Sequence, residues 1–125
     1  MLKDTFFKIL EFSNEGNKDV FKVEINQQHK IFEGHFPGNP VVPGVCLFQM
    51  VKECIEVKEA KKLQLSKAKE IKFLSIVNPQ LNNVLHIEII PGMEEDGLLP
   101  YNIVVYDGTN VCLKMKSAFA VSSYQ

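Results

Sequence analysis

The sequence contains no apolar run long enough to cross a bilayer and no low-complexity stretch. It also lacks an excess of charge of either sign, because 14 basic residues stand against 15 acidic ones. Nucleic-acid-binding proteins usually carry a basic excess or stripe, so we expect neither a nucleic-acid partner nor a membrane partner. No apolar run of signal-peptide length follows Met1. We therefore expect a cytoplasmic protein.

Cysteine is scarce as well. Cys46, Cys54 and Cys112 are odd in number and widely spaced, which favours reduced core thiols over a disulfide framework. His29 and His86 have no second metal ligand at a plausible spacing, so we expect no metal and no cofactor. Cys46 falls near the expected start of a helix, where a thiol is sometimes reactive, but it has no recognisable catalytic partner.

What the sequence does contain indicates one globular domain over residues 1–125. Of these residues 46% are apolar and 23% are charged. A chain of this size buries roughly two-thirds of the surface that its unfolded form exposes, so it folds without disulfides or a structural metal.

Periodicity divides the chain into strands around one helix. Apolar and polar residues alternate over residues 18–27, and apolar residues recur every three or four positions from residue 45 to 57. Further strands are expected near residues 5–12, 70–77, 84–90, 99–106 and 111–121, with an irregular Gly- and Pro-rich loop after residue 27 and a Lys-rich surface connection near residues 58–72. Five or six antiparallel strands and one long buried helix predict an α+β fold.

The loop before the helix carries the most specific motif. Residues 34–45 read GHFPGNPVVPGV, and residues 71–79 read IKFLSIVNP. Both segments resemble the bacterial 3-hydroxyacyl-acyl carrier protein dehydratases of fatty acid synthesis, and the resemblance covers most of the chain. It implies the hotdog fold, in which an antiparallel sheet wraps around the central helix.

The resemblance also implies a site at the amino end of that helix. Dehydration of a 3-hydroxyacyl thioester requires a base, a donor to the carbonyl oxygen and an acid for the departing hydroxyl. His35 suits the first role, because imidazole is basic yet largely neutral near pH 7. The backbone N–H groups of Gly44 and Val45 suit the second role. Phe32 and Phe36 either pack the loop or line an acyl tunnel.

One position departs from the family pattern. The family's second catalytic residue is an acid fourteen positions after the His, where this chain has Gln49. An amide holds a hydroxyl or water but does not exchange a proton at neutral pH. Glu53 lies four residues further, on the same helical face, so it is a candidate substitute acid. The alternative is a solvated glutamate that pairs with a lysine, with Gln49 as a polar wall of the pocket.

Two classes of function therefore remain. The first is an enzyme, a hydro-lyase acting on 3-hydroxyacyl thioesters or another acyl-thioester enzyme such as a thioesterase. The second is a catalytically weak module that binds an acyl carrier protein, paired with a fuller homologue. Both stay open, and we favour the enzyme.

The resemblance implies a homodimer, or a higher oligomer of dimers, with the His of one subunit facing the helix of the other. The acyl group would arrive on an acyl carrier protein or on coenzyme A. Acyl carrier proteins are acidic, and the sequence has one dense basic stretch that is a candidate docking surface or simply a solvated face. Its members are Lys58, Lys61, Lys62, Lys67, Lys69 and Lys72.

Overall fold

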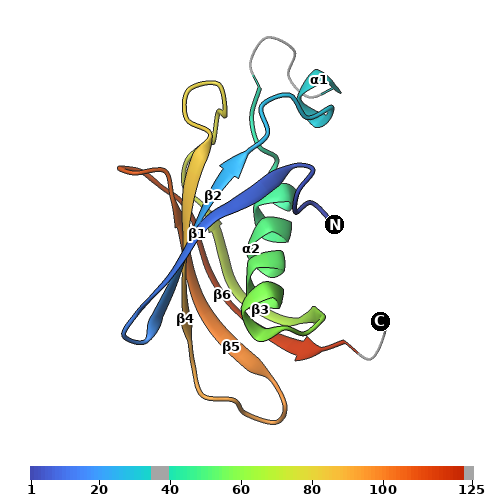
Figure 1. The fold of residues 1–125 in the computed structure, drawn as a ribbon. Helices are drawn as coiled ribbons and strands as arrows, with labels where there is room; N and C mark the ends of the chain where they lie inside the picture. The colour runs from blue at the N-terminus through green and yellow to red at the C-terminus, as the bar shows by residue number, and fades with distance from the viewer. Residues whose placement is uncertain (35–39, 123–125) are drawn as a thin grey trace.

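The computed structural model describes residues 1–34 and 40–122, which form one antiparallel sheet and one long helix (Figure 1). The six strands lie in the order β1-β2-β4-β5-β6-β3. They are β1 (Phe7–Glu15), β2 (Lys18–Ile25), β3 (Leu63–Phe73), β4 (Val84–Pro91), β5 (Leu99–Tyr106) and β6 (Val111–Val121). The helices are α1 (Ile31–Gly34) and α2 (Gly44–Glu59).

Helix α2 lies along the concave side of the curved sheet (Figure 1). One face of the helix is buried, and its apolar members are Cys46, Leu47, Met50, Val51, Cys54 and Ile55. They share one core with buried side chains from the sheet, among them Phe21, Leu85, Ile87, Ile103, Leu113 and Phe119. The apolar face of the helix and that of the sheet bury each other, which holds α2 against the sheet. The predicted α+β fold is confirmed.

The ends of α2 follow from the local sequence. Pro43, with φ −60° and ψ 146°, precedes the first helical residue, and its fixed φ and missing N–H suit a helix start. Ala60 adopts a left-handed conformation with φ 56° and donates its N–H to the Glu56 carbonyl, which ends the helix. The helix expected at residues 45–57 is therefore present and slightly longer.

Strand β3 differs from the sequence-based expectation. We expected a strand at residues 70–77 and a surface connection near residues 58–72, but the strand spans Leu63–Phe73. In the sheet order it is a terminal strand, paired with β6 alone, and most of its side chains are exposed. A strand without a buried face shows no alternation of apolar and polar residues, so its start was misplaced.

The other strands differ from expectation mainly at their ends. The expected bounds of β5 and β6 match the structure, and β4 ends one residue later than expected. Strand β1 runs to Glu15, because Asn14 and Glu15 pair with Asp19 and Lys18 of β2. We had ended this strand near residue 12, so its last three residues were missed, and Gly16 and Asn17 are left at the tip of the hairpin.

The described parts of the segment between β2 and α2 contain one short helix and a hydrogen bond to a distant part of the chain. The helix is α1, and the backbone N–H of Val42 donates to the Val77 carbonyl at 2.9 Å. That bond ties the approach to α2 to the segment that follows β3. His35 and Phe36 lie outside the described residues. Within residues 1–34 and 40–122, no helix is long and apolar enough to cross a membrane.

Candidate active site

The amino end of α2 presents free backbone donors. The N–H groups of Cys46 and Leu47 bind the Pro43 carbonyl at 2.9 and 3.2 Å. In the described part of the chain, no backbone carbonyl accepts from the N–H of Gly44 or Val45. The positive end of the helix dipole coincides with these two donors. An oxygen that gains negative charge would be stabilised at this point.

A close contact that the sequence did not reveal favours glycine at position 44. A Cβ atom at position 44 would lie 2.9 Å from Cζ of Phe73, at the end of β3. Any larger residue would therefore have to displace the Phe73 ring. We had assigned Gly44 to a backbone N–H donor for the carbonyl, and its packing against Phe73 is a separate reason for glycine.

Exposed apolar side chains flank this end of the helix. Val45 follows Gly44 in the chain, and the ring of Phe73 packs over Gly44. Ile76 precedes Val77, whose carbonyl accepts the Val42 N–H. Their exposed fractions are 74% for Val45, 55% for Phe73 and 76% for Ile76. We call these three residues the apolar rim. An acyl chain or a protein partner is the kind of group that such a surface covers.

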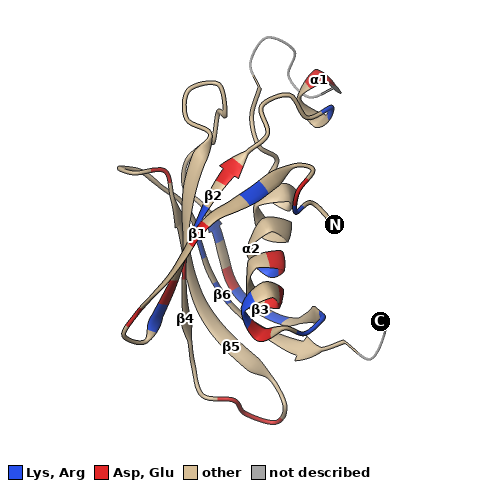
Figure 2. Cartoon of the chain, viewed as in Figure 1, with Lys and Arg blue, Asp and Glu red and all other residues tan. Residues whose placement is uncertain are grey.

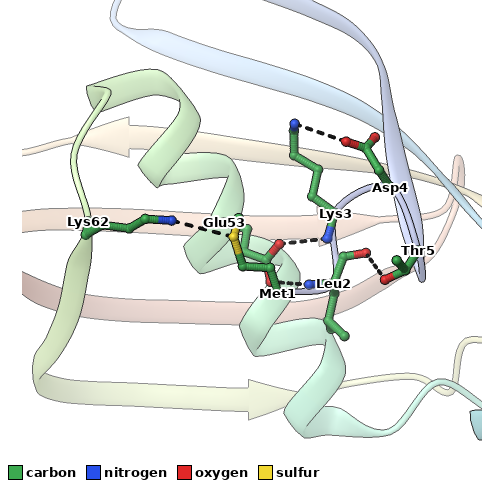
Figure 3. A network of polar contacts seen from close by, with 7 residues as sticks. All are labelled: Met1, Leu2, Lys3, Asp4, Thr5, Glu53 and Lys62. Atoms are coloured by element: carbon green, nitrogen blue, oxygen red, sulfur yellow. Dashed lines mark hydrogen bonds and ion pairs between the residues drawn. The ribbon is translucent and has the colours of Figure 1, made fainter. Parts of the chain in front are cut away.

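Gln49 and Glu53 lie in direct contact on the next turns of α2. The Gln49 side chain donates from Nε2 to Oε2 of Glu53 at 2.8 Å. Glu53 also accepts the backbone N–H of Leu2 and that of Lys3, each at 2.8 Å (Figure 3). The side chain is buried, with 1% of the residue exposed. The interpretation of Glu53 as a solvated, lysine-paired residue is therefore wrong.

The hydrogen bonds control the ionisation of Glu53. Burial alone raises the pKa of this carboxyl, but the bonds from Leu2, Gln49 and Lys3 outweigh it and lower the pKa below its usual range. The group therefore stays ionised at neutral pH, where it accepts hydrogen bonds and does not donate a proton. The sequence placed Glu53 near Gln49 but gave no sign of the two backbone donors.

Phe32 packs the start of the loop. Its ring lies 5.6 Å from that of Phe6, which is fully buried. Nδ1 of His29 accepts the Ile31 N–H at 3.1 Å, and the His29 ring meets Phe6 edge-on. The loop-packing role of Phe32 is confirmed, whereas contact with an acyl chain stays a prediction.

The remaining histidine and the cysteines form no second site. His86 stacks on Tyr106 with ring centres 5.2 Å apart. Cys46, Cys54 and Cys112 are free and buried, and burial raises the pKa of each thiol, that of Cys54 to about 12. Such thiols stay protonated and unreactive at neutral pH. Within the described residues, no group of three or more potential metal ligands occurs.

The lysines of the basic stretch are distributed over the end of α2, the connection after it and strand β3 (Figure 2). Lys58 is half-buried and binds Asp19 and Glu59, each at 3.2 Å. Lys72 pairs with Glu70 at 2.8 Å. The other members, Lys61, Lys62, Lys67 and Lys69, are exposed. Strand pairing adds Lys114 and Lys116 of β6 beside β3, because Lys72 is opposite Lys114 and Glu70 is opposite Lys116.

The sequence is similar to known dehydratases. The family model described as ApeI dehydratase, of the ApeI-like group, matches residues 11–113. A 3-hydroxyacyl-acyl-carrier-protein dehydratase FabZ from Lactiplantibacillus plantarum is 28% identical over 101 residues, covering 75% of this chain and 69% of the relative. The FabZ of Rickettsia felis is 30% identical over 79 residues, covering 62% of this chain. The chain spans about half of that relative's length, 53%.

Solved structures share the fold at low sequence identity. The dehydratase heterocomplex ApeI:P from Xenorhabdus doucetiae matches with a TM-score of 0.69 and 19% identity, covering 90% of this chain and 96% of that chain. A thioesterase from Staphylococcus aureus matches with a TM-score of 0.68 and 8% identity, covering 97% of both chains. The fold is therefore the hotdog fold, as predicted. With the family model matching most of its length, the chain belongs to the ApeI-like dehydratase family.

Proposed function

We propose that this protein eliminates water from a 3-hydroxyacyl thioester to give a trans-2-enoyl thioester in fatty acid or related acyl-chain synthesis. The observation that carries the proposal is the open amino end of α2 in a member of a dehydratase family. Gly44 and Val45 offer two N–H donors at one point, next to exposed apolar side chains. A thioester carbonyl needs such donors when its α-carbon loses a proton.

In this mechanism His35 is the base that removes a proton from C2 of the substrate. The Gly44 and Val45 N–H groups stabilise the negative charge that develops on the thioester oxygen. The C3–O bond then breaks, a double bond forms between C2 and C3, and the proton held by His35 joins the departing hydroxyl as water. Protons and electrons balance without a cofactor.

Gln49 holds the departing hydroxyl in this scheme. Its side chain lies on α2 one turn before Glu53, and it is half-buried. An amide binds a hydroxyl through hydrogen bonds but supplies no proton. The single imidazole therefore both takes and returns the proton, and turnover is expected to be slower than with a separate acid, by up to about 10²–10⁴-fold.

We further propose a cytoplasmic homodimer, or an oligomer of such dimers, that takes its acyl group from an acyl carrier protein or from coenzyme A. Strand β3 ends the sheet with one unpaired edge, and an exposed edge is commonly covered by another chain. The exposed lysines near β3 would meet an acidic carrier protein. Reversing the charge of Lys67 and Lys69 together should weaken carrier binding, and unchanged affinity would exclude this docking surface.

The experiment offers a 3-hydroxyacyl thioester on carrier protein and on coenzyme A, and measures the enoyl product and the hydrolysis product separately. Enoyl formation is read by its absorbance and thioester hydrolysis by the release of free thiol. We expect enoyl product from the wild type and a loss of about 10²–10⁴-fold in His35→Ala. His86→Gln is the matched control, because this histidine stacks on Tyr106 on the sheet and has no role in the scheme.

The same assay decides against the alternatives. Release of thiol without enoyl product would indicate a thioesterase. No turnover of any thioester by wild type and His35→Ala alike would reject the enzyme and favour a module that binds an acyl carrier. One observation favours the carrier-binding module, because Gln49 and an ionised Glu53 leave α2 without a proton donor at this point. A homologous partner subunit would then supply the acid.

A further inference from the structure

Glu53 is a buried carboxylate to which the mechanism above assigns no step. It lies in contact with Gln49. Figure 3 shows its contacts with the backbone at the start of the chain. We propose that Glu53 is a positioning residue that fixes the Gln49 amide with its carbonyl oxygen free for the substrate hydroxyl, and that the N–H groups of Leu2 and Lys3 hold Glu53 in place. This inference rests on the proposed dehydratase function.

The orientation of the amide follows from the chemistry of its partner. An ionised carboxylate only accepts hydrogen bonds, so the Gln49 nitrogen, not its oxygen, must face Glu53. The carbonyl oxygen of Gln49 then points away from Glu53. Within the described residues, no donor binds that oxygen. Gln49 therefore presents a hydrogen-bond acceptor where the family resemblance places an acid.

Three donors restrain the carboxylate. Oε2 of Glu53 receives the Leu2 N–H and the Gln49 amide, and Oε1 receives the Lys3 N–H. With the residue 1% exposed, water has little access to compete for these bonds. The side chain therefore has one orientation available to it, and so does the amide bound to it. The first residues of the chain thus contribute to the site without touching substrate.

An acceptor in this place supports a mechanism with one base. The departing hydroxyl must receive the proton of His35 on one of its lone pairs. If the hydroxyl donates its own hydrogen to the Gln49 oxygen, a lone pair is left facing the imidazolium. A reversed amide would donate an N–H to the hydroxyl oxygen and occupy that lone pair. The orientation of the Gln49 amide therefore determines how readily the proton is returned.

The first test uses two variants of α2 that change one carboxylate each. Glu53→Gln offers one carbonyl oxygen to three donors, so we expect kcat to fall about tenfold, the effect of one misplaced hydrogen bond, with KM nearly unchanged. Glu56→Gln is the matched control, because Glu56 also binds a backbone N–H, that of Leu63 at 2.9 Å, but does not bind Gln49. Equal kcat losses in both variants would overturn the proposal.

A double variant separates positioning from proton transfer. In a Gln49→Ala background, adding Glu53→Gln should lower kcat no further, since Glu53 acts through Gln49. The pH profile of kcat should keep the same number of ionisations in Glu53→Gln. A further tenfold loss in the double variant, or the disappearance of one limb of the profile, would show that Glu53 acts directly on the substrate and would overturn the proposal.

A second readout does not need turnover. In the nuclear magnetic resonance spectrum, the Gln49 side-chain NH₂ signals should be shifted and protected from solvent exchange in the wild type and in Glu56→Gln. They should become like those of an exposed glutamine in Glu53→Ala. Lys3→Pro removes one backbone donor and should loosen the amide, whereas Lys3→Ala keeps that donor. A wild type that is inactive but shows protected Gln49 signals would reject the dehydratase function and still support the holding of the Gln49 amide by Glu53. Unprotected Gln49 signals in the wild type would reject the proposal that Glu53 holds the Gln49 amide.

Discussion

The two halves of α2 differ in charge and in contacts. Residues 44–51 contain no charged side chain, whereas residues 52–59 contain two lysines and three glutamates (Figure 2). The first half begins with two N–H donors that no backbone carbonyl of the described residues accepts, next to exposed apolar residues. The second half is tied to the rest of the molecule by its carboxylates. The proposed binding groups and the charged anchors are thus separated along one helix.

Each glutamate of the second half reaches a different segment. Glu53 accepts the backbone N–H groups of Leu2 and Lys3. Glu56 accepts the N–H of Leu63 at the start of β3. Glu59 accepts the hydroxyl of Tyr101 at 2.5 Å. These contacts fix the helix along its length and in rotation. The open end is held instead by the apolar packing of Cys46 and Leu47 in the core. Substitutions in the two halves should therefore affect different measurements.

The largest effect on stability is expected at Glu53. Glu53→Ala leaves two backbone N–H groups and the Gln49 amide without an acceptor, so we expect the free energy of unfolding to fall by about 3 kcal/mol. Urea denaturation at pH 7 measures this change. A loss below about 0.5 kcal/mol would mean that water replaces the carboxylate and that Glu53 is no anchor.

At the opposite end, Gly44→Ala should affect turnover instead. The new methyl group would displace the Phe73 ring, whose Cζ lies 2.9 Å from the Cβ position, and alter the apolar rim. We expect enoyl formation to slow by about 10- to 100-fold, as misplacement of a site does, with the free energy of unfolding changed by less than about 1 kcal/mol. Adding Phe73→Leu should restore part of the rate. No recovery would mean that Gly44 matters for another reason.

The carboxylate anchors also predict how stability depends on pH. Burial raises the pKa of Glu53 and that of Glu59, but hydrogen bonds lower both below the ordinary value of about 4.3, and nearby lysine charge adds to this effect at Glu59. Their contribution is therefore fully present above that value and is lost as pH falls through the lowered values. Urea midpoints measured from pH 7 to pH 3 should fall below about pH 4.3, and less steeply in Glu53→Gln.

Glu56→Gln should give the smallest effect. The amide oxygen of the new side chain still accepts the Leu63 N–H, and the pair that Glu56 forms with Lys52 at 3.9 Å is weak. We expect a loss of about 0.5 kcal/mol or less in urea denaturation. A loss as large as that of Glu53→Ala would remove the distinction between the carboxylates of this helix.

The sequence predicts most of the sheet because buried strands alternate. Strands β5 and β6 have one buried face each and a turn between them, and their predicted bounds match the structure. Strand β3 has almost no buried side chain, so its first part carried no such pattern. Local sequence thus determines where a buried strand lies, but an exposed edge strand becomes visible only through its pairing with β6.

The candidate site was predictable in part. Helical spacing placed Gln49 and Glu53 on one face, and the structure brings them to 2.8 Å. The contact of Glu53 with Leu2 and Lys3 joins residues about fifty positions apart through backbone N–H groups. Every residue type except proline has such a group, so no side-chain pattern signals the contact. The role of His35 stays a prediction.

The central claim is that the amino end of α2 binds the thioester carbonyl. Backbone amide shifts in a nuclear magnetic resonance titration with a non-reactive acyl-pantetheine analogue test it most directly. We predict that the largest shifts fall on Gly44 and Val45, with smaller changes along the second half of α2. Shifts confined to the β1–β2 hairpin or to the end of the helix near Ala60, with Gly44 and Val45 unmoved, would contradict the account.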